Sequence, residues 1–399
     1  MKEVYIVDAV RTPVGRMGGT LKTAQAHELG AVVCKALMER TGLDPKLVEE
    51  VVIAQVKQNA KASNIARVIS LMAGFPEEIP SYTLMMQCGS SMQSVHCAAN
   101  DIRCGDVDVA VAGGVEAMSD THFELWNARY GYNTGNNAIY DPIVEGARRA
   151  QPQDAYGAFG MGDTAENVAE AYGIQREAMD EFAFESQRRA AEAVAAGVFR
   201  GEIAPVVIPQ RKKDPIVFDT DEQPRATTME GLAKLKPVFR TDGKGKVTAG
   251  NSCGRSDCGA ALLLMSGEKV RELWVKPMAK LVGQAIVGVD PRLMGIGPVP
   301  AVRKVLAKTG LKLEDIGLFE LNEAFAAQSL AVINELGLDR SRVNVNGGAI
   351  ALGHPLGATG ARILTTLVHG MKRTGTRYGI ATLCMGGGQG GATLLELCP

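Results

Sequence analysis

The sequence predicts an α/β protein built from two similar halves. Short apolar runs that suit buried strands alternate with longer segments whose apolar residues recur at helical spacing. This order of elements occurs at the start of the chain and again after residue 260. At 399 residues the chain has room for about two or three subdomains. We expect the two halves to face each other and to share one cleft.

The first half contains a strand-helix-strand rhythm that is interrupted by glycine-rich loops. The clearest helix is predicted for 26–41, where Leu29, Val33 and Leu37 share one face and Gly42 follows the last turn. Apolar runs and turn residues predict the other elements: strands at 4–7, 51–56, 82–86 and 107–112, helices at 65–73 and 90–104, and a loop at 8–19.

The composition changes in the middle of the chain, between residues 118 and 240. This part is richer in charged, aromatic and turn residues, and it holds two strong helical patterns at 164–171 and 176–196. We interpret it as an insertion of surface loops in an α/β body, not as a third core.

The second half repeats the first at coarse scale. Its predicted elements are strands at 260–265, 279–289, 316–321, 378–384 and 392–396, and helices at 298–308, 359–373 and one ending near 336. Each half contains a glycine-rich loop that leads into a helix. Cys88 opens one of these helices and His354 precedes the other.

Composition and charge exclude several classes of protein. A net charge of -1 argues against a general nucleic-acid binder. The eight cysteines have no paired short spacing, which disfavours a disulfide framework and a zinc ribbon. No apolar run reaches the roughly 18 residues of a membrane span, and the chain enters a strand at once without a signal-peptide pattern. We expect a cytoplasmic protein that binds neither nucleic acid nor membranes.

Cys88 is the first candidate for chemistry because it lies where a strand ends and a helix starts. The partial positive charge of a helix N-terminus favours a thiolate, so the position predicts a pKa below the free value of about 8.5. The residue would then be a nucleophile. An equally open reading is a buried structural cysteine, one of eight in the chain.

Two further candidates lie in glycine-rich segments of the second half. His354 is surrounded by small residues that let a backbone approach a ligand closely, although a plain turn could also contain a histidine. Cys384 is followed by Met385 and three glycines, whose N–H groups could hold an oxyanion or could simply form a sharp turn. A zinc site is disfavoured, because a metal would occupy the thiolates that these loops expose.

Seven stretches make the chain resemble the thiolase family over nearly its whole length. They are DAVRTPVGR at the start, CGSSMQS at 88–94, AGGVEAMS at 112–119, MGDTAENVA at 161–169, LNEAFAAQ at 321–328, GGAIALGHPLGATGAR at 347–362 and CMGGGQG at 384–390. The resemblance implies an α/β fold of duplicated βαβαβαββ halves in a five-layered α-β-α-β-α arrangement with an inserted loop domain. It implies three parts: 1–117 plus 250–270, the loop domain at 118–249, and 271–399.

The resemblance also implies roles for the candidate residues. Cys88 would carry the acyl group and His354 would take its thiol proton. Cys384 would be the second acid and base, acting on the α-carbon of acetyl-CoA. Asn322 would hold a water that, with His354, stabilises the enolate oxygen. The backbone N–H groups of Cys88 and Gly386 would form the other oxyanion hole.

Coenzyme A would be bound as a substrate, with no permanently bound cofactor or metal and with a homodimer or homotetramer as the assembly. The implied contacts to coenzyme A and the acyl group are Arg225, Met161, Phe239, Ala249, Cys253, Ala324 and Phe325. The chain departs from the family pattern at two of the nearby positions. Cys253 stands where a serine is usual, and Arg255 replaces a usual apolar residue.

The resemblance leaves several functions open. Gly160 stands where short-chain thiolases often have histidine, which favours a 3-ketoacyl-CoA thiolase of fatty-acid β-oxidation over an acetoacetyl-CoA-specific enzyme. A non-catalytic thiolase-like carrier of acyl-CoA or lipid is the rival of another class. It is disfavoured because Cys88, Asn322, His354 and Cys384 are all present. The cysteine of CMGGGQG argues against a condensing enzyme that uses acyl carrier protein.

Overall fold

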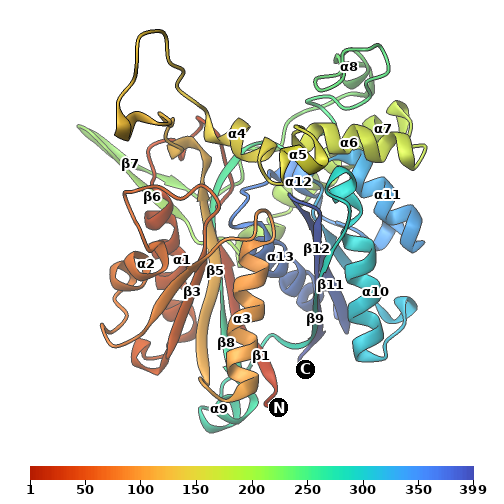
Figure 1. Cartoon of the computed structure of the whole chain (residues 1–399). Coiled ribbons are helices and arrows are strands. Elements are labelled where there is room, and N and C mark those ends of the chain that lie inside the picture. Colours follow the sequence, from red (N-terminus) through yellow and green to blue (C-terminus); the bar gives the residue numbers. More distant parts are fainter.

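A computed structural model describes all 399 residues and contains one ten-stranded sheet made of two matching halves (Figure 1). From the middle outward, the first half has the order β1, β8, β5, β3, β4 and the second has β9, β12, β11, β10. The strands are β1 Val4–Arg11, β2 Gly15–Arg16, β3 Glu50–Ala54, β4 Ser81–Leu84, β5 Val109–Ala117, β8 Ser256–Ser266, β9 Ala279–Gly288, β10 Leu318–Leu321, β11 Tyr378–Met385 and β12 Gln389–Leu397.

Strand direction shows that the two halves are duplicates. In each half the two inner pairings are antiparallel and the next is parallel. The parallel β3–β4 pair has a reduced counterpart in the second half, a single parallel bridge between Phe319 and Val343. The halves join where β1 pairs with β9, at Tyr5 and Lys280 and at Ile6 and Ala279. The repeat inferred from sequence rhythm is confirmed by this topology.

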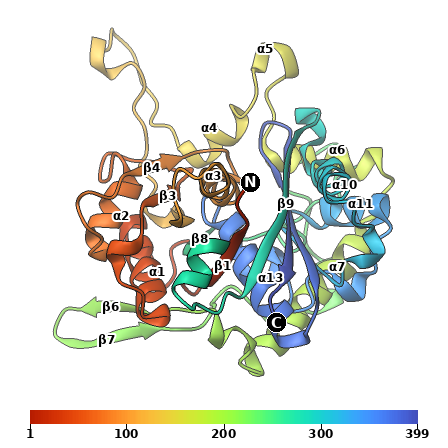
Figure 2. The same cartoon turned by 90° about the horizontal axis from the view of Figure 1, so that it is seen from below.

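Helices cover both faces of each half of the sheet. Three layers of helices and the two halves of the sheet thus alternate as five layers (Figure 2). Helices α1 and α2 cover the outer face of the first half, α3 and α13 form the central layer, and α10 and α11 cover the second half. The helices are α1 Ala26–Thr41, α2 Ile65–Ala73, α3 Ser90–Cys104, α4 Pro142–Arg148, α5 Gln153–Tyr156, α6 Met161–Ala171, α7 Arg176–Ala195, α8 Met229–Ala233, α9 Gly267–Glu272, α10 Pro298–Thr309, α11 Ala326–Leu336, α12 Ala349–Leu352 and α13 Thr359–Thr374. None is both long and apolar enough to span a membrane.

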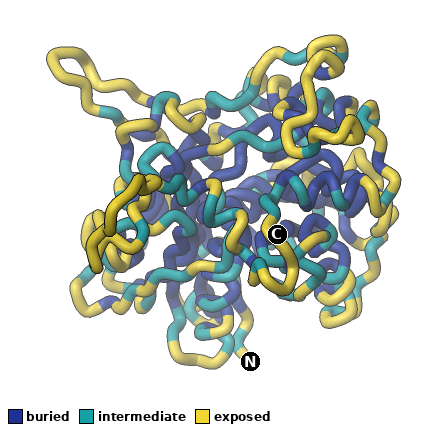
Figure 3. Tube along the Cα trace, turned by 45° about the horizontal axis from the view of Figure 1, so that its top comes forward, coloured by how far each residue is buried: buried dark blue, intermediate teal, exposed yellow.

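The segment between β5 and β8 gathers mainly at one end of the molecule, away from the two termini (Figure 1). It contains α4 to α8 and a separate hairpin of β6 Val206–Gln210 and β7 Lys213–Phe218. Much of this segment is exposed, in contrast to the buried centre of the two halves (Figure 3). The strong helices predicted here are confirmed as α6 and α7.

Two predicted boundaries are wrong for identifiable reasons. The loop predicted from residue 8 begins later, because β1 continues to Arg11. The Arg11 side chain is buried and paired with Glu202 at 2.6 Å and Asp221 at 2.7 Å. The strand predicted to stop before Gly113 continues through it as β5. A Cβ on Gly113 would lie 2.2 Å from the Ala260 carbonyl oxygen, so the glycine permits close pairing with β8.

The central layer depends on a close contact between α3 and α13. A Cβ added to Gly360, near the start of α13, would lie 2.2 Å from the backbone nitrogen of Met92 in α3. No side chain fits at that distance, so the helices can touch only through the glycine. This contact holds the start of α13 beside the start of α3, the two helices that follow His354 and Cys88.

We expect Gly360→Ala to lower the free energy of unfolding by about 1–3 kcal/mol, as overpacking in a core does. Gly370→Ala is the matched control in the same helix, because its Cβ would meet only Leu318 Cδ1 at 3.7 Å. It should leave stability unchanged or raise it by up to about 1 kcal/mol. Urea unfolding of both variants measures the difference, and equal midpoints would contradict the contact.

Candidate active site

Cys88 lies in a sharp turn between β4 and α3. Gln87 adopts a left-handed conformation with φ of 47°, which is unusual for a residue with a side chain. The Ser90 hydroxyl holds the turn by donating to the Gln87 carbonyl at 2.5 Å and accepting from the Met86 N–H at 2.7 Å. The turn therefore fixes the position of Cys88, whose side chain is largely buried.

The second half approaches this turn through the end of β11. A Cβ on Gly89 would lie 2.3 Å from the Sδ atom of Met385, so Met385 packs directly on the glycine. Next along the chain, the backbone N–H of Gly386 lowers the pKa of the Cys88 thiol, as does the N–H of Cys88 itself, against the larger effect of burial. Two backbone N–H groups, one from each half, thus act on one sulfur. This arrangement can stabilise negative charge that develops beside Cys88.

The ring of His354 is held in one tautomer by a threonine at the start of α13. Nδ1 lies 2.7 Å from the Thr359 hydroxyl oxygen, and that hydroxyl donates its only hydrogen to the Pro355 carbonyl at 2.9 Å. The histidine must therefore donate from Nδ1, which leaves Nε2 unprotonated. Nε2 is buried and has no partner in the chain, so it is free to accept a proton.

The surroundings of His354 keep its ring neutral. Burial lowers the pKa of His354 to about 3, and the positive charge of Arg362 acts in the same direction. The backbone N–H of His354 donates to Gly254 at 3.0 Å and to the Ser256 hydroxyl at 3.1 Å. The imidazole is thus a fixed neutral base in a site where an imidazolium would be costly.

Asn322 follows β10 and is almost fully buried, with neither side-chain polar atom hydrogen-bonded within the protein. Its backbone N–H donates to the Thr382 carbonyl at 3.0 Å, which ties it to β11. A buried amide left unpaired costs free energy unless a water or ligand completes it. The position therefore suits the water-holding role that the sequence predicts.

Cys384 lies near the end of β11 and is fully buried. It packs in a small apolar cluster with Ala165, Val247, Met294, Ala324 and Phe325. Burial raises the pKa of its thiol well above the ordinary value, and the neighbouring Cys88 and Cys253 thiols act in the same direction. The site therefore contains three mutually close thiols, two of them predicted catalytic residues and the third a departure from the family pattern.

The pKa of the Cys88 thiol corrects the sequence interpretation, which predicted a value below that of a free cysteine. Burial raises the pKa of Cys88 to about 11, although the two N–H groups and Lys57 oppose the shift. The positive end of α3 does not overcome desolvation once the second half covers the sulfur. The raised pKa values keep both Cys88 and Cys384 as protonated thiols near neutral pH.

The segment 251–256 crosses the site and links its parts. Its Asn251 carbonyl accepts from the Ala326 N–H at 2.9 Å, the Cys253 N–H donates to Ala324 at 3.1 Å, and the Gly254 carbonyl accepts from His354. The segment therefore joins the chain after Asn322 to the loop of His354. It also places the half-buried Cys253 between them.

The residues predicted to contact coenzyme A form two groups. Met161, Ala324 and Phe325 surround Cys384, and the ring of Phe239 meets that of Phe325 edge-on with centroids 6.2 Å apart. The exposed Arg225 lies further out and donates to the Ala249 carbonyl at 3.3 Å. The first group adjoins the thiols, and the second lies at the surface.

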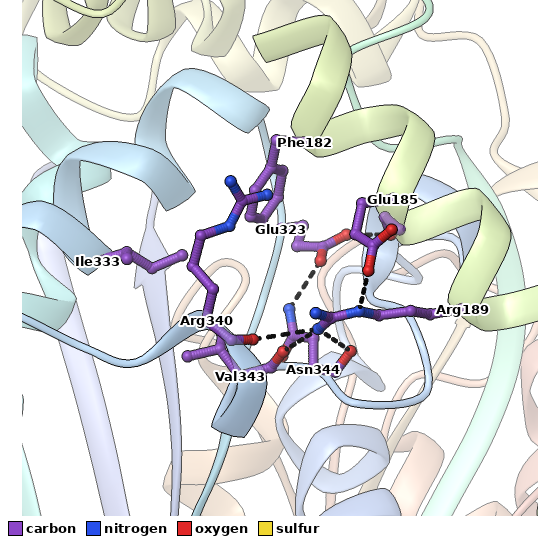
Figure 4. A pocket seen from close by; sticks show the side chains of 9 residues that line it. Phe182, Glu185, Arg189, Glu323, Ile333, Arg340, Val343 and Asn344 are labelled. Carbon is purple, nitrogen blue, oxygen red and sulfur yellow. Dashed lines mark hydrogen bonds and ion pairs between the residues drawn. The ribbon is translucent and has the colours of Figure 1, made fainter. Parts of the chain in front are cut away.

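Sequence reasoning missed residues that position the site. The buried Glu323 carboxylate accepts from Ser186 at 2.7 Å, Asn344 at 2.8 Å and the Ile350 N–H at 3.2 Å. Figure 4 shows it beside Asn344 in a small cavity against α7. Glu323 follows Asn322 directly, so its bond to Ile350 ties the chain at Asn322 to α12, the helix that leads to His354. Its place in LNEAFAAQ was a signal, but only the fold reveals its partners.

Glu116 performs a similar task at the end of β5. Its carboxylate accepts from the N–H groups of Lys57 at 3.0 Å and Gly357 at 2.8 Å. Burial raises the pKa of Glu116 to about 7. The contact connects the first half to the loop that follows His354.

Thr359, which binds Nδ1 of His354, is the third positioning residue, after Glu323 and Glu116, that the sequence did not single out.

Comparison with known proteins agrees with this geometry. Family models described as "Thiolase, N-terminal domain" and "Thiolase, C-terminal domain" match residues 4–268 and 275–397. The chain belongs to the thiolase family. A protein of Pseudomonas aeruginosa named acetyl-CoA acetyltransferase is 51% identical, with 99% of each chain covered.

Solved structures of two related enzymes are similar to this thiolase over its whole length. The Bacillus anthracis acetyl-CoA acetyltransferase matches with a TM-score of 0.96 and 46% identity, and human mitochondrial 3-ketoacyl-CoA thiolase with 0.94 and 39%. In both cases 100% of this chain and 99% of the other are covered. The predicted fold and family are confirmed, and the protein is an acyltransferase enzyme. The alternative of a non-catalytic carrier is not favoured.

We predict that alkylation of Cys88 by iodoacetamide is slow at neutral pH and accelerates as the pH rises past 9. A raised pKa keeps the thiol protonated below it, and only the thiolate reacts. Mass spectrometry of the Cys88 peptide measures the rate, with the exposed Cys104 as a control for reagent access. A rate that reaches its plateau below about pH 8.5 would contradict desolvation as the dominant effect.

Proposed function

We propose that this thiolase transfers acyl groups between coenzyme A and acetyl-CoA through a thioester on Cys88. The observation that carries the proposal is that N–H groups from both halves act on the Cys88 thiol, which has the Cys384 thiol as a neighbour. The neutral His354, fixed by Thr359, lies on the loop before α13. The sulfur attacks the 3-carbonyl of a 3-ketoacyl-CoA while Nε2 of His354 takes the thiol proton. The N–H groups of Cys88 and Gly386 bind the oxyanion that forms.

The second half of the reaction uses the other thiol. The bond between C2 and C3 breaks, the acyl group stays on Cys88, and the Cys384 thiol gives its proton to C2 of the departing acetyl-CoA enolate. Asn322, through a water, and His354 hold the enolate oxygen. Free coenzyme A then gives its thiol proton to the Cys384 thiolate and attacks the Cys88 thioester. The shortened acyl-CoA leaves, and the proton held by His354 returns to the Cys88 sulfur. Every step moves protons and acyl groups without a change of oxidation state, so the reaction calls for no permanent cofactor or metal.

The open space at Gly160 favours the proposal of substrates longer than acetoacetyl-CoA. A Cβ on Gly160 would meet only the Asp163 carboxylate oxygen, at 3.7 Å, so the position is open beside Met161. The relatives' names include both acetyl-CoA acetyltransferase and 3-ketoacyl-CoA thiolase, so the names do not fix the chain length. We propose a 3-ketoacyl-CoA thiolase of the kind used in fatty-acid β-oxidation, with acetoacetyl-CoA specificity as the alternative.

The loop domain at 118–249 is proposed to cover bound coenzyme A. Phe239 reaches from this domain to Phe325 of the second half, and Arg225 lies at the outer rim. Within this proposal, Met161, Phe239, Ala324 and Phe325 surround the pantetheine and acyl groups. Cys253 takes the place of a serine hydroxyl, and Ala249 lines the path toward the nucleotide.

We further propose a cytoplasmic homodimer or homotetramer. All eight cysteines are free, which suits a reducing compartment. Strand β4 pairs on one side only. The exposed Tyr82 lies in this strand, and the exposed Met85 follows it directly. A projecting loop carries the apolar Phe123 and the 91%-exposed Tyr130. An unpaired strand edge and apolar loop side chains favour association with further copies of the chain.

A series of 3-ketoacyl-CoA substrates tests the proposed function. Purified protein with free coenzyme A should cleave acetoacetyl-CoA and 3-ketoacyl-CoAs of six to ten or so carbons, because the pocket is open at Gly160. The loss of the substrate's enolate absorbance measures cleavage. Cleavage of acetoacetyl-CoA alone would select the short-chain alternative, and no cleavage of any substrate would overturn the proposal.

Two cysteine variants separate the predicted roles. Cys88→Ala should abolish covalent acyl labelling by acyl-CoA and reduce turnover at least about 10⁴-fold, because no nucleophile remains. Cys384→Ala should keep the label and lose turnover, since only proton transfer at carbon is removed. Intact-protein mass spectrometry reads the label. A label that survives the first substitution would place the nucleophile at another residue.

A further inference from the structure

A polar hollow of about 480 Å³ lies beside Gln87, the residue that precedes Cys88. Fifteen residues line the hollow, and only four of them are hydrophobic. They come from the chain at 56–60, from the turn after β4 and from the loop domain between 121 and 149. A saturated acyl chain would bury little apolar surface against this lining. The hollow therefore suits a ligand group that is itself polar.

The hollow begins one side chain away from the N–H group of Gly386. A Cβ on Gly386 would lie 3.6 Å from Cγ of Gln87 and 3.6 Å from Cβ of Ala150. The Sδ atom of Met161 would lie 3.4 Å from the same Cβ. Because the Gln87 side chain also lines the hollow, an acyl chain on Cys88 that extends along Gln87 enters it.

Lys57 is a half-buried cation in the wall of the hollow that forms no ion pair. Its ammonium donates to the Pro142 carbonyl at 2.7 Å, whereas Lys61 in the same loop pairs with Asp120 at 2.5 Å. The positive charge of Lys57 lowers the pKa of the Cys88 thiol, so the ammonium is close enough to act on the sulfur. An ammonium has three donors, and those not bound to Pro142 are available to an anion.

The two carboxylates in the lining are bound to other partners. Glu124 accepts from Nε1 of Trp126 at 2.8 Å. Glu145 pairs with Arg149 at 3.4 Å, and that guanidinium also lies over the Trp126 ring, 4.7 Å from its centroid. These contacts balance the charges on one side of the hollow and leave Lys57 as its unpaired charge.

The segment around α4 connects the Lys57 ammonium to the candidate active site. A Cβ on Gly146 would lie 2.7 Å from Nζ of Lys57, so the glycine leaves the room that the ammonium occupies. Ala150, four residues later, adjoins Gly386. The ammonium and the N–H group of Gly386 therefore lie at the two ends of a short stretch of chain. An extended acyl group attached to Cys88 has its far end on the side of Lys57.

We propose that the polar hollow binds a carboxylate at the far end of the acyl chain, so that the preferred substrates are 3-ketoacyl-CoAs derived from dicarboxylic acids. The proposal rests on the proposed function and names its substrate class more narrowly. The Lys57 ammonium binds the terminal carboxylate, and the Gln87 amide donates to it or to a polar group along the same path. This contact is remote from the reacting carbonyl and selects the substrate without taking part in the chemistry.

The test compares pairs of 3-ketoacyl-CoAs of equal length, about six to ten carbons, in which one chain ends in a methyl group and the other in a carboxylate. The ratio of kcat/KM within each pair measures the preference. At the best chain length the wild-type protein should prefer the carboxylate about 10- to 100-fold, as expected for hydrogen bonds to a charged group. This comparison requires no variant.

Two lysine variants assign the preference to the hollow. Lys57→Met keeps the length of the side chain without its charge and should remove most of the preference. Any effect of Lys57 on the reactivity of Cys88 acts on both substrates of a pair and cancels in the ratio. Lys61→Met is the matched control, because it makes the same change in the same loop outside the hollow, and it should keep the preference.

The outcomes separate this proposal from the proposed function. Wild-type protein that cleaves methyl-ended chains as well as or better than carboxylate-ended ones overturns the dicarboxylic substrate class and leaves thiolase activity intact. Cleavage of neither form overturns both proposals. A preference that survives Lys57→Met, or that Lys61→Met removes equally, shows that the hollow does not bind the carboxylate and also overturns this proposal.

Discussion

The candidate site depends on one close approach between the halves, where Met385 packs on Gly89. Any side chain at Gly89 would collide with Met385, and the next N–H along that strand, of Gly386, reaches the Cys88 sulfur. Cys88 comes from the first half, while Asn322, His354 and Cys384 come from the second. The duplication therefore creates a site that neither half contains alone, and glycines set how closely its two sides meet.

Burial also sets the protonation states of the candidate residues. It raises the pKa of the Cys88 and Cys384 thiols and lowers that of His354, so the resting groups are neutral. Under the proposed mechanism, charge forms only during reaction and is met by N–H groups already in place. Such fixed donors need no reorganisation when the oxyanion forms. Glu323, Glu116 and Thr359 hold the loops so that this arrangement persists.

Local signals allowed much of the fold to be predicted from sequence. Helices at 65–73 and 90–104 match α2 and α3 because Gly74 and Gly105 end them in left-handed conformations. Residues whose role depends on distant partners are harder to predict from sequence. Gly113 predicts the end of a strand, but the structure shows that it permits close pairing of β5 with β8. The helix start predicts a lowered pKa for Cys88, but the thiol is buried with Met385, which lies far later in the chain, and burial raises the pKa.

Motif identity supplied the catalytic candidates, but the tautomer of the histidine required the structure. Nothing in the sequence links Thr359 to Nδ1 of His354, since the contact depends on how the loop turns before α13. The polar hollow beside Gln87 was equally hidden, because its residues come from four separated segments. Nothing in the sequence around Lys57 singles it out from the other lysines.

Nitrogen-15 NMR of histidine-labelled protein tests the central claim most directly, that His354 is a neutral base with Nε2 free. The signal that disappears in His354→Asn identifies the ring among five histidines. We predict a proton on Nδ1 and none on Nε2 from neutral pH down to about 5, because the pKa is lowered to about 3. A doubly protonated ring at pH 7, or a proton on Nε2 alone, would contradict it.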